Sequence, residues 1–265
     1  MKPYPLENYG EAGLAAPIQV LPTAEAEALA AKVLAAEATE AGAQALRSFA
    51  HLQFPWLYDL ATHERVLDAV ETVLGPDLLI WAAEFFIKPA QSGSYISWHQ
   101  DSTYGGLEPA TITTAWIALT PSVEESGCLM VAPGTHKMAQ LPHADSFAAD
   151  NLLSRGQEVQ VDVSTLETTH VELEPGQMSL HHVQLVHGSE PNRASWPRLG
   201  FAVRFIPTSV RQRGGRTLVV LARGEDRFGH FDLAPRPEAD LTPEAVAIAA
   251  DAQARLKAIT MPESA

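Results

Sequence analysis

Hydrophobic and polar positions follow a helical period in the first part of the chain. Apolar residues of the segment 63–74 recur on one helical face, and Gly75-Pro76 is a typical helix end. Thr23 is a plausible N-cap for an alanine-rich stretch that carries acids in its first turn. We therefore expect residues 1–76 to form a mostly helical buttress.

From Leu78 onward the pattern changes to short β-prone runs separated by glycine and proline turns. The runs are Leu78–Lys88, Tyr95–His99, Thr111–Leu119, Cys128–Val131, His170–Leu173, Met178–Val186, Leu199–Ile206 and Thr217–Leu221. Short strands with turn residues between them favour a β-sandwich or barrel over a parallel βαβ sheet. We expect a β core over residues 77–225.

The last forty residues predict a loop and a helix. Thr242 stands at the N-cap position, Pro243 at the first helical position and an acid follows in the first turn. No internal repeat or linker is visible. The sequence thus predicts one domain over 1–265, mainly β, with flanking N-terminal and C-terminal helices and with residues 226–265 as the C-terminal loop and helix.

Charge and cysteine content narrow the classes of function. Acids outnumber bases 32 to 18, giving a formal net charge of −14 that disfavours nucleic acid and anionic membrane surfaces. The single cysteine excludes an internal disulfide and a CxxC metal site. No apolar run is long enough to span a membrane, and we expect a cytoplasmic protein. Eight of the thirteen arginines lie between Arg193 and Arg227, mostly as solvated surface in our interpretation.

One His-x-Asp pair ends a β-prone run. In an extended chain His99 and Asp101 point the same way, so both side chains could reach one metal ion while Gln100 points to the opposite face. A second pair, His143 and Asp145, lies in a polar stretch that we interpret as a loop. The spacing alone is weak evidence for a metal site.

A third ligand would complete a two-histidine, one-carboxylate triad, the usual non-haem Fe(II) arrangement. His187 opens a His-Gly-Ser segment after a β run, whereas His181 and His182 in the same run are more typical of packed strand residues. Arg198 follows eleven residues after His187, and its guanidinium is suited to hold a carboxylate.

Three segments together resemble the phytanoyl-CoA dioxygenase family of Fe(II)/2-oxoglutarate oxygenases, which includes ectoine hydroxylase-like enzymes. They are WHQD at 98–101, AWIALTPSVEESGCLMVAPGTHK at 115–137 and HGSEPNRASWPRLGFAVRF at 187–205. Weaker similarity in FFIKPAQSG at 85–93 extends the resemblance to roughly residues 75–206. The joint order of these motifs is highly specific.

The resemblance implies a double-stranded β-helix (jelly-roll, cupin-like) core and a defined set of site residues. Those matching the iron ligands are His99, Asp101 and His187. Those matching 2-oxoglutarate contacts are Arg198, Ser189 and Trp116. The turn Pro133-Gly134-Thr135 matches a structural element beside the site, and Gln100 could contact its edge.

The implied cofactors are Fe(II), 2-oxoglutarate as cosubstrate and O₂. The implied reaction hydroxylates an unactivated C–H bond and releases succinate and CO₂. Halogenating relatives replace the metal carboxylate with a small residue, so the presence of Asp101 disfavours halogenation.

Substrate contacts are less defined by the sequence. Glu84 and Phe86 share one face of the run before the iron motif, and Glu84 could either recognise an amine or face solvent. Tyr104 is a candidate lid residue in a glycine-flanked loop, and Arg204 is either a second anion contact or a structural ion-pair partner. The charge of −14 favours a small metabolite over an acyl-CoA thioester.

Two other classes of function remain as alternatives. A non-catalytic jelly-roll would bind the metal and 2-oxoglutarate without consuming them. A zinc hydrolase would use the same three ligands plus a water, but it would have no use for Arg198. We expect a small-molecule substrate, no nucleic acid or membrane partner, and a monomer or homodimer.

Overall fold

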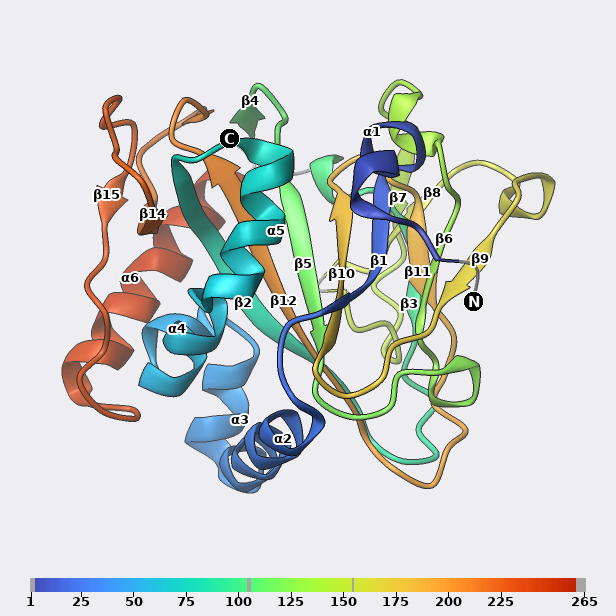
Figure 1. Cartoon of the computed structure of the whole chain (residues 1–265), viewed down its shortest axis with the longest axis horizontal. Coiled ribbons are helices and arrows are strands. Elements are labelled where there is room, and N and C mark those ends of the chain that lie inside the picture. The colour runs from blue at the N-terminus through green and yellow to red at the C-terminus, as the bar shows by residue number, and fades with distance from the viewer. Residues whose placement is uncertain (1–2, 104–105, 154, 261–265) are drawn as a thin grey trace. The chain divides into compact units, whose positions relative to one another are not determined.

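The computed structural model describes residues 3–103, 106–153 and 155–260. They form a mixed α/β structure with several antiparallel sheets and a C-terminal helix (Figure 1). The chain divides into two compact units, each built from three separate stretches. The first unit contains Met1–Ala30, Phe86–Thr103 and Trp116–Phe201. The second unit contains Ala31–Phe85, Tyr104–Ala115 and Ala202–Ala265.

The helices and strands have the following bounds. The α-helices are α1 (Tyr9–Ala12), α2 (Thr23–Glu37), α3 (Glu40–Leu46), α4 (Pro55–Ala61), α5 (Glu64–Leu74) and α6 (Pro243–Thr260). The 3₁₀ turns are η1 (Leu6–Asn8), η2 (Ala50–Leu52), η3 (Asp101–Thr103), η4 (Glu124–Ser126), η5 (Thr135–Lys137) and η6 (Val163–Thr165). The strands are β1 (Leu14–Gln19), β2 (Leu78–Lys88), β3 (Ile96–His99), β4 (Leu107–Glu108), β5 (Thr113–Ala118), β6 (Leu129–Val131), β7 (His143–Asp145), β8 (Gln157–Val159), β9 (Thr169–Val171), β10 (Gln177–His182), β11 (His187–Ser189), β12 (Arg198–Pro207), β13 (Arg211–Gln212), β14 (Leu218–Arg223) and β15 (Asp232–Leu233).

The strands belong to two larger sheets and two small ones. The hydrogen-bonding order of the seven-stranded sheet is β1-β10-β5-β12-β2-β14-β15. The four-stranded sheet lies in the first unit in the order β3-β11-β6-β9, whose members stand side by side in Figure 1. Two-stranded sheets join β7 with β8 and β13 with β4. Most pairs are antiparallel, whereas β14 and β15 run parallel.

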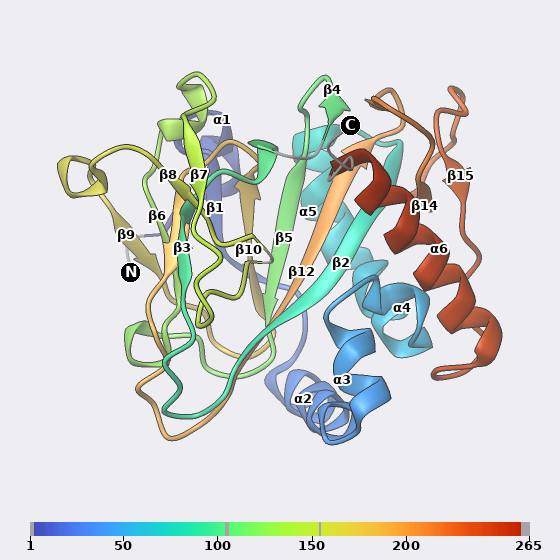
Figure 2. The same cartoon turned by 180° about the vertical axis from the view of Figure 1, so that it is seen from behind.

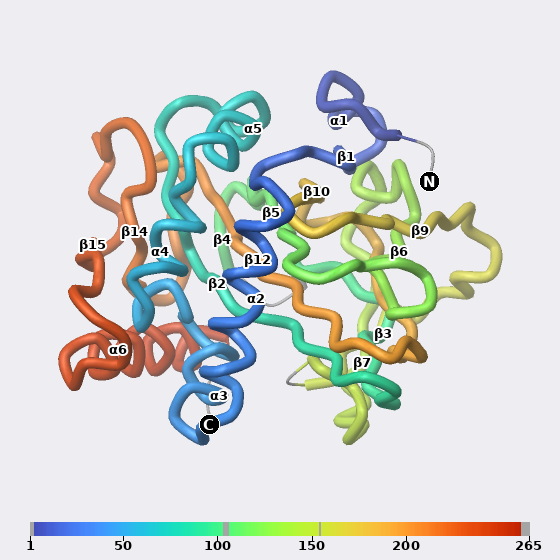
Figure 3. Tube along the Cα trace, turned by 60° about the horizontal axis from the view of Figure 1, so that its bottom comes forward, coloured from blue at the N-terminus to red at the C-terminus, as the bar shows by residue number. Residues whose placement is uncertain are grey.

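Helix ends and apolar faces place the helices of the second unit much as the sequence predicts. Helix α5 buries its Val66, Leu67 and Val70 side chains and ends at Gly75, whose φ of 87° favours glycine. Figure 3 traces the chain from α3 through α4 into α5. Helix α6 contacts η2 and also β14, beside which it lies in Figure 2. Thr242 Oγ1 accepts a hydrogen bond of 3.2 Å from Ala245 N, which confirms the predicted cap. Within the described ranges, no helix has the length and apolar character needed to cross a membrane.

Several strands depart from the sequence predictions. β1 lies inside the region expected to be helical. This segment is a strand because it pairs antiparallel with β10, about 160 residues later, and the local hydrophobic pattern carries no signal of so distant a partner. The run expected over Met178–Val186 ends at His182, where a turn leads to β11. His143–Asp145, expected as a loop, forms β7 and pairs with β8.

Candidate metal centre

The first unit brings the three predicted metal ligands together. Strands β3 and β11 are antiparallel neighbours with His187 directly opposite His99, and the two imidazole centroids lie 4.1 Å apart. The Nε2 atom of His99 is 3.4 Å from Oδ1 of Asp101. One donor atom from each of His99, Asp101 and His187 lies within 4.8 Å of the others. A single metal ion between them could contact all three.

A turn, and not the pleat of a strand, presents the carboxylate. Strand β3 ends at His99, and Asp101 begins the 3₁₀ turn η3. The expectation that both side chains project from one extended segment is therefore wrong in its detail, although the two side chains do meet. The amide of Ser102 donates to the carbonyl of Val183, which fixes the turn against the segment that leads to His187.

Hydrogen bonds to backbone carbonyls orient both imidazoles. The Nδ1 atom of His99 lies 2.9 Å from the carbonyl oxygen of Ser97, and Nδ1 of His187 lies 2.8 Å from that of Leu185. A carbonyl only accepts, so each Nδ1 carries the proton and each Nε2 keeps a lone pair for a metal. Burial and the neighbouring His99 lower the pKa of His187 well below its usual value, which favours the neutral form that a metal needs.

This donor set fits Fe(II). Two neutral imidazoles and one carboxylate supply three ligands and leave other coordination positions open. His99 and His187 are 2% and 6% exposed, so the cluster is shielded from bulk water while Asp101 stays partly accessible. The set also matches some catalytic zinc sites. The anion-binding groups described next distinguish the two possibilities.

Arg198 is a buried cation at the start of β12. It is 1% exposed, its Nη2 atom makes one long bond of 3.4 Å to the carbonyl of Phe86, and its buried Nε has no hydrogen-bond partner among the described residues. Burial lowers the pKa of Arg198 to about 10. A buried guanidinium with an unused donor is costly unless an anion completes it. The geometry therefore fits a carboxylate ligand.

Trp116 forms one wall beside this guanidinium. The Arg198 Cζ atom lies 5.1 Å from the centroid of the Trp116 ring, within the range of a cation–π contact. A Cβ added to Gly200 would lie 1.8 Å from the same ring, so only glycine permits this packing. Arg198 and Trp116, both predicted as cosubstrate residues, are thus adjacent, and their cosubstrate role stays a prediction.

Lys88 is a second buried basic side chain, which the sequence did not single out. Its Nζ donates to Ser189 Oγ at 2.6 Å and to the carbonyls of Gly127, at 3.2 Å, and Glu190. It is fully buried, and burial together with the charge of Arg198 lowers the pKa of Lys88 to about 6. The signal for Lys88 was its place at the end of a strand within the resembling segment FFIKPAQSG.

The surroundings of Lys88 hold it in place without supplying a carboxylate bond. The Asn192 amide donates to the carbonyl of Lys88 at 3.1 Å and to that of Pro89 at 3.0 Å. A Cβ on Gly127 would lie 2.2 Å from the Glu190 carbonyl oxygen, so glycine lets this backbone approach the ammonium. The neighbouring Cys128 is a neutral thiol, since burial raises its pKa to about 12. Arg198, Lys88 and the Ser189 hydroxyl thus lie together in the interior, and we call them the cation pair with Ser189.

The candidate substrate residues Glu84 and Phe86 both lie on β2. In the second unit Glu84 Oε1 accepts from Arg204 Nη1 at 2.7 Å, so Arg204 takes the ion-pair role that was one of its two predicted alternatives. Phe86, in the first unit, is half-buried. Tyr104 lies outside the described residues. The amine-binding role of Glu84 stays a prediction.

The remaining histidines and arginines largely have structural partners. His181 is buried against the His187 ring, and burial lowers the pKa of its neighbour His182 to about 4. Thr135, in the predicted structural turn, accepts from the amide of Val186 at 3.0 Å. Arginines of the cluster between 193 and 227 pair with acids, in the bonds Arg211 and Arg213 to Glu108, Arg216 to Asp232, Arg223 to Glu71 and Arg227 to Glu225.

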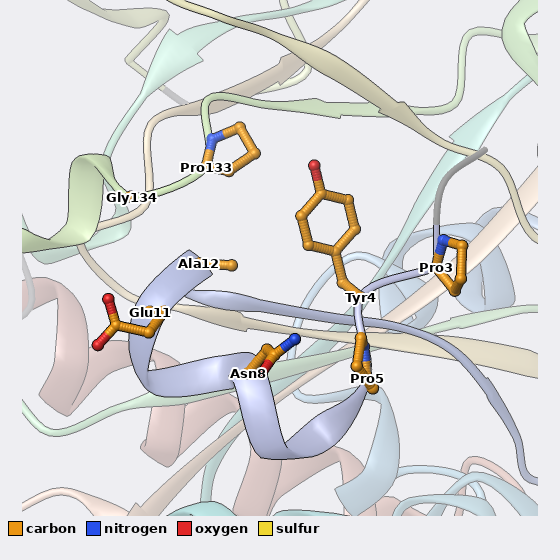
Figure 4. Close-up of a pocket in the computed structure, with 8 residues that line it drawn as sticks. All are labelled: Pro3, Tyr4, Pro5, Asn8, Glu11, Ala12, Pro133 and Gly134. Atoms are coloured by element: carbon orange, nitrogen blue, oxygen red, sulfur yellow. The ribbon is translucent and has the colours of Figure 1, made fainter.

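A hollow of about 460 Å³ also lies in the first unit, on another part of its surface. Figure 4 shows Tyr4 and Pro133 projecting into it from the N-terminal segment and from the loop before η5. The predicted metal ligands and the cation pair do not contribute to its lining. This hollow is therefore separate from the candidate chemistry.

Comparison with known families gives a match over most of the chain. The family model described as phytanoyl-CoA dioxygenase (PhyH) matches residues 9–200. A probable phytanoyl-CoA dioxygenase of Caenorhabditis elegans is 32% identical over 146 residues, which are 52% of this chain and 47% of that protein. The chain spans about half the length of the curated relatives it matches.

Solved structures resemble the chain over nearly its whole length. The apo non-heme monooxygenase ThoJ is 33% identical with a TM-score of 0.84, and the match covers 95% of each chain. CytC3 with Fe(II) and alpha-ketoglutarate matches at 22% identity with a TM-score of 0.67, over 92% of this chain and 97% of that one. At 22% identity, the match to CytC3 shows a similarity of fold alone.

Proposed function

Because the chain belongs to the phytanoyl-CoA dioxygenase family, we propose that it is an Fe(II)- and 2-oxoglutarate-dependent dioxygenase that hydroxylates a small-molecule metabolite. The observation that carries the proposal is the pairing, within one unit, of a two-histidine, one-carboxylate cluster with two buried basic side chains that bond no carboxylate among the described residues. A zinc hydrolase would need the first feature and not the second.

His99, Asp101 and His187 would hold the iron. When bound, the iron supplies activation of O₂ and oxidation of a C–H bond, coupled to conversion of 2-oxoglutarate to succinate and CO₂. The chain contributes orientation, since backbone carbonyls hold the Nδ1 protons of both imidazoles, which would leave each Nε2 lone pair for the metal. Burial keeps His187 neutral and excludes competing water.

The cation pair with Ser189 would bind the far carboxylate of 2-oxoglutarate. Arg198 offers the unused Nε donor, and its guanidinium fork suits a carboxylate. Ser189 Oγ accepts from Lys88, which leaves the hydroxyl hydrogen to donate to the bound carboxylate. Trp116 would wall the cosubstrate beside Arg198. A dianion entering this buried cluster restores the charge of Lys88, which is largely neutral without it.

We further infer that the seven-stranded and four-stranded sheets are those of a double-stranded β-helix. The antiparallel sheet orders and the similarity in fold to CytC3 support this finer description. The single-domain organisation over 1–265, the cytoplasmic location and the monomeric or homodimeric state stay predictions from the sequence.

For the substrate we propose a chemical class, a small metabolite, and no particular compound. Relatives are named for phytanoyl-CoA, hypophosphite and ectoine, so family membership alone allows chemically distant substrates. A net charge of −14 disfavours the polyanionic acyl-CoA type and favours a small metabolite. Phe86 and Tyr104 stay candidate contacts. An amine at Glu84 would share this carboxylate with Arg204, which already donates to Oε1.

Reconstitution tests the proposed reaction. The protein is loaded anaerobically with Fe(II), then given 2-oxoglutarate, O₂ and a panel of small metabolites, and succinate is measured. We expect substrate-stimulated succinate, abolished in Asp101→Ala and His187→Ala and retained in the control His170→Ala, which changes a half-buried histidine of β9. Unchanged turnover in the two ligand variants would overturn the metal assignment. Metal and 2-oxoglutarate binding without any succinate would instead support the non-catalytic alternative.

A further inference from the structure

The peptide between two predicted iron ligands is held by a side chain from a distant strand. The backbone N–H of Gln100, which links His99 to Asp101, donates to Nε2 of His143 at 3.0 Å. The Nδ1 atom of His143 lies 2.8 Å from the carbonyl oxygen of Leu141. Because that carbonyl only accepts, Nδ1 carries the proton and Nε2 is the acceptor. His143 Nε2 is therefore the acceptor of a hydrogen bond from the Gln100 backbone N–H.

The Gln100 side chain ties the same peptide to two further segments. It is 1% exposed, and its Nε2 donates to the carbonyl of Gln184 at 2.8 Å, three residues before His187. Its Oε1 accepts from the amide of Leu141 at 2.9 Å and from Nε2 of Gln140 at 3.0 Å. One residue thus links the His99–Asp101 segment, the segment before His143 and the turn that leads to the third ligand.

An apolar cluster supports these hydrogen bonds. Ala132, Val159 and Val186 are buried together, and Trp98 and Leu141 pack against them. Trp98 and Val186 directly precede the ligands His99 and His187 in the chain. The side chains beside both ligands and beside His143 therefore share one packed cluster, so a shift of one segment is resisted by the others.

We propose that His143 and Gln100 are positioning residues, which fix the peptide between the two ligands of one segment and join it to the turn before the third. This inference rests on the proposed function and deepens it. The donors of His99 and Asp101 are separated by a single residue, so rotation of the Gln100 peptide moves them relative to each other. An acceptor at His143 Nε2 opposes that rotation, and loss of this bond leaves a partly buried N–H unsatisfied.

Two substitutions at position 143 separate hydrogen bonding from packing. His143→Leu keeps an apolar side chain of similar size but accepts no hydrogen bond, whereas His143→Gln retains an acceptor of similar reach. Asp145→Asn is the matched control, because Asp145 lies on the same strand as His143 and the change weakens its ion pair with Arg155 without touching the Gln100 peptide. Gln100→Ala keeps the backbone N–H bond and removes only the side-chain bonds.

Co(II) titration of the metal-free protein, followed by visible absorption, measures affinity and ligand geometry together. Residues that hydrogen-bond around a metal site and hold its ligands in place typically change metal affinity by about 10- to 100-fold. We therefore expect about a tenfold weaker Co(II) affinity and an altered spectrum in His143→Leu. His143→Gln and Asp145→Asn should match the wild type, and Gln100→Ala should also alter the spectrum. Thermal unfolding of each metal-free variant is recorded as the measure of plain stability.

The outcomes distinguish the inference from the proposed function. Wild-type affinity and spectrum in both His143→Leu and Gln100→Ala would overturn the positioning role. Equal weakening in Asp145→Asn and His143→Leu would also overturn it, since hairpin stability would then explain both. Failure of the wild type to bind Co(II) would overturn the proposed function itself, and the inference with it.

Discussion

Two His-x-Asp pairs of identical spacing, His99 with Asp101 and His143 with Asp145, have different surroundings in the structure. His99 and Asp101 lie beside His187, and their donor atoms converge. In the other pair, His143 already accepts a backbone hydrogen, and the Asp145 carboxylate bonds to the guanidinium of Arg155, with Nε to Oδ2 at 2.9 Å. A carboxylate neutralised by arginine is a poor competitor for a metal. The identity of the neighbours, and not the spacing, separates a ligand pair from a supporting pair.

The same contrast separates the arginines. Arg155 has its charge met by Asp145, and Arg211 and Arg213 share Glu108. Arg198 is buried with an unused Nε donor, and Lys88 beside it bonds a hydroxyl and two carbonyls. Burial without an acidic partner is the feature that marks a site for an anion from outside the chain.

Replacing the carboxylate of each His-x-Asp pair in turn should give the largest difference between the two pairs. Asp101→Ala should weaken Fe(II) affinity by more than about 100-fold, because loss of a ligand exceeds the effect of losing an outer hydrogen bond. Asp145→Ala should leave that affinity unchanged. Anaerobic Fe(II) titration measures both. Equal losses in the two variants would abolish the distinction between the pairs.

The next largest effect concerns the two classes of arginine. Arg198→Ala should raise the 2-oxoglutarate concentration needed for half-saturation by about 30-fold or more, since it removes one partner of a buried charged contact. Fe(II) affinity should change little. Arg155→Ala, the surface-side control, should alter neither. Equilibrium binding of 2-oxoglutarate to the Fe(II) protein decides this, and similar affinity in Arg198→Ala and wild type would refute the role of Arg198.

Lys88 makes 2-oxoglutarate binding depend on pH. In the free protein its pKa is about 6, and a bound carboxylate favours the ammonium, so binding takes up a proton. The affinity should therefore fall as pH rises above about 6, by at most tenfold per pH unit. Lys88→Met should bind more weakly and lose this slope. Isothermal titration in buffers of different ionisation enthalpy measures how many protons are taken up when 2-oxoglutarate binds. If Lys88→Met keeps the same pH dependence, another residue takes up that proton.

The same residue affects stability in the opposite direction. The unfolded lysine keeps its usual pKa of 10.5, so between about pH 6 and that value the unfolded state binds more protons than the native state. The free energy of unfolding contributed by Lys88 should rise with pH across this window. Denaturant unfolding of wild type and Lys88→Met at both ends of the window measures the difference, and parallel pH profiles would contradict the depressed pKa.

The smallest expected effect is at the wall of the proposed cosubstrate site. Gly200→Ala adds a methyl group 1.8 Å from the Trp116 ring, so the ring must move. Overpacking of this kind costs about 1–3 kcal/mol of stability. Thermal unfolding of Gly200→Ala should show this loss of stability. A binding titration should show a 2-oxoglutarate affinity that is weaker by a few-fold. Wild-type values for both would mean that the ring has space to shift freely.

The parts of the fold that follow local pattern were predictable from sequence. The apolar stripe of α5, the cap at Thr242 and the continuous run of β2 each depend on neighbours within a few residues. β1 was not predictable, because an alanine- and proline-containing run becomes a strand only by pairing with β10. The short hairpin β7–β8 was missed for the same reason.

The candidate site shows a similar division. The residues His99, Asp101, His187 and Arg198 could be proposed from motif spacing and resemblance, because each lies in a segment with recognisable chemistry. Lys88 lies within a resembling segment but was not proposed, because a lysine at a strand end is usually solvated and only the tertiary structure shows that it is buried. The bond from Gln100 to His143 joins residues 43 positions apart, which no local pattern reveals.

Visible charge-transfer absorption of the anaerobic Fe(II) protein on addition of 2-oxoglutarate tests directly whether His99, Asp101 and His187 hold an iron that also binds 2-oxoglutarate. Such a band would arise when Fe(II) and 2-oxoglutarate are bound to each other. We expect a saturable band in the wild type, no band in Asp101→Ala, and a band in Arg198→Ala only at much higher 2-oxoglutarate. Absence of the band in the wild type, or its persistence in Asp101→Ala, would refute this assignment.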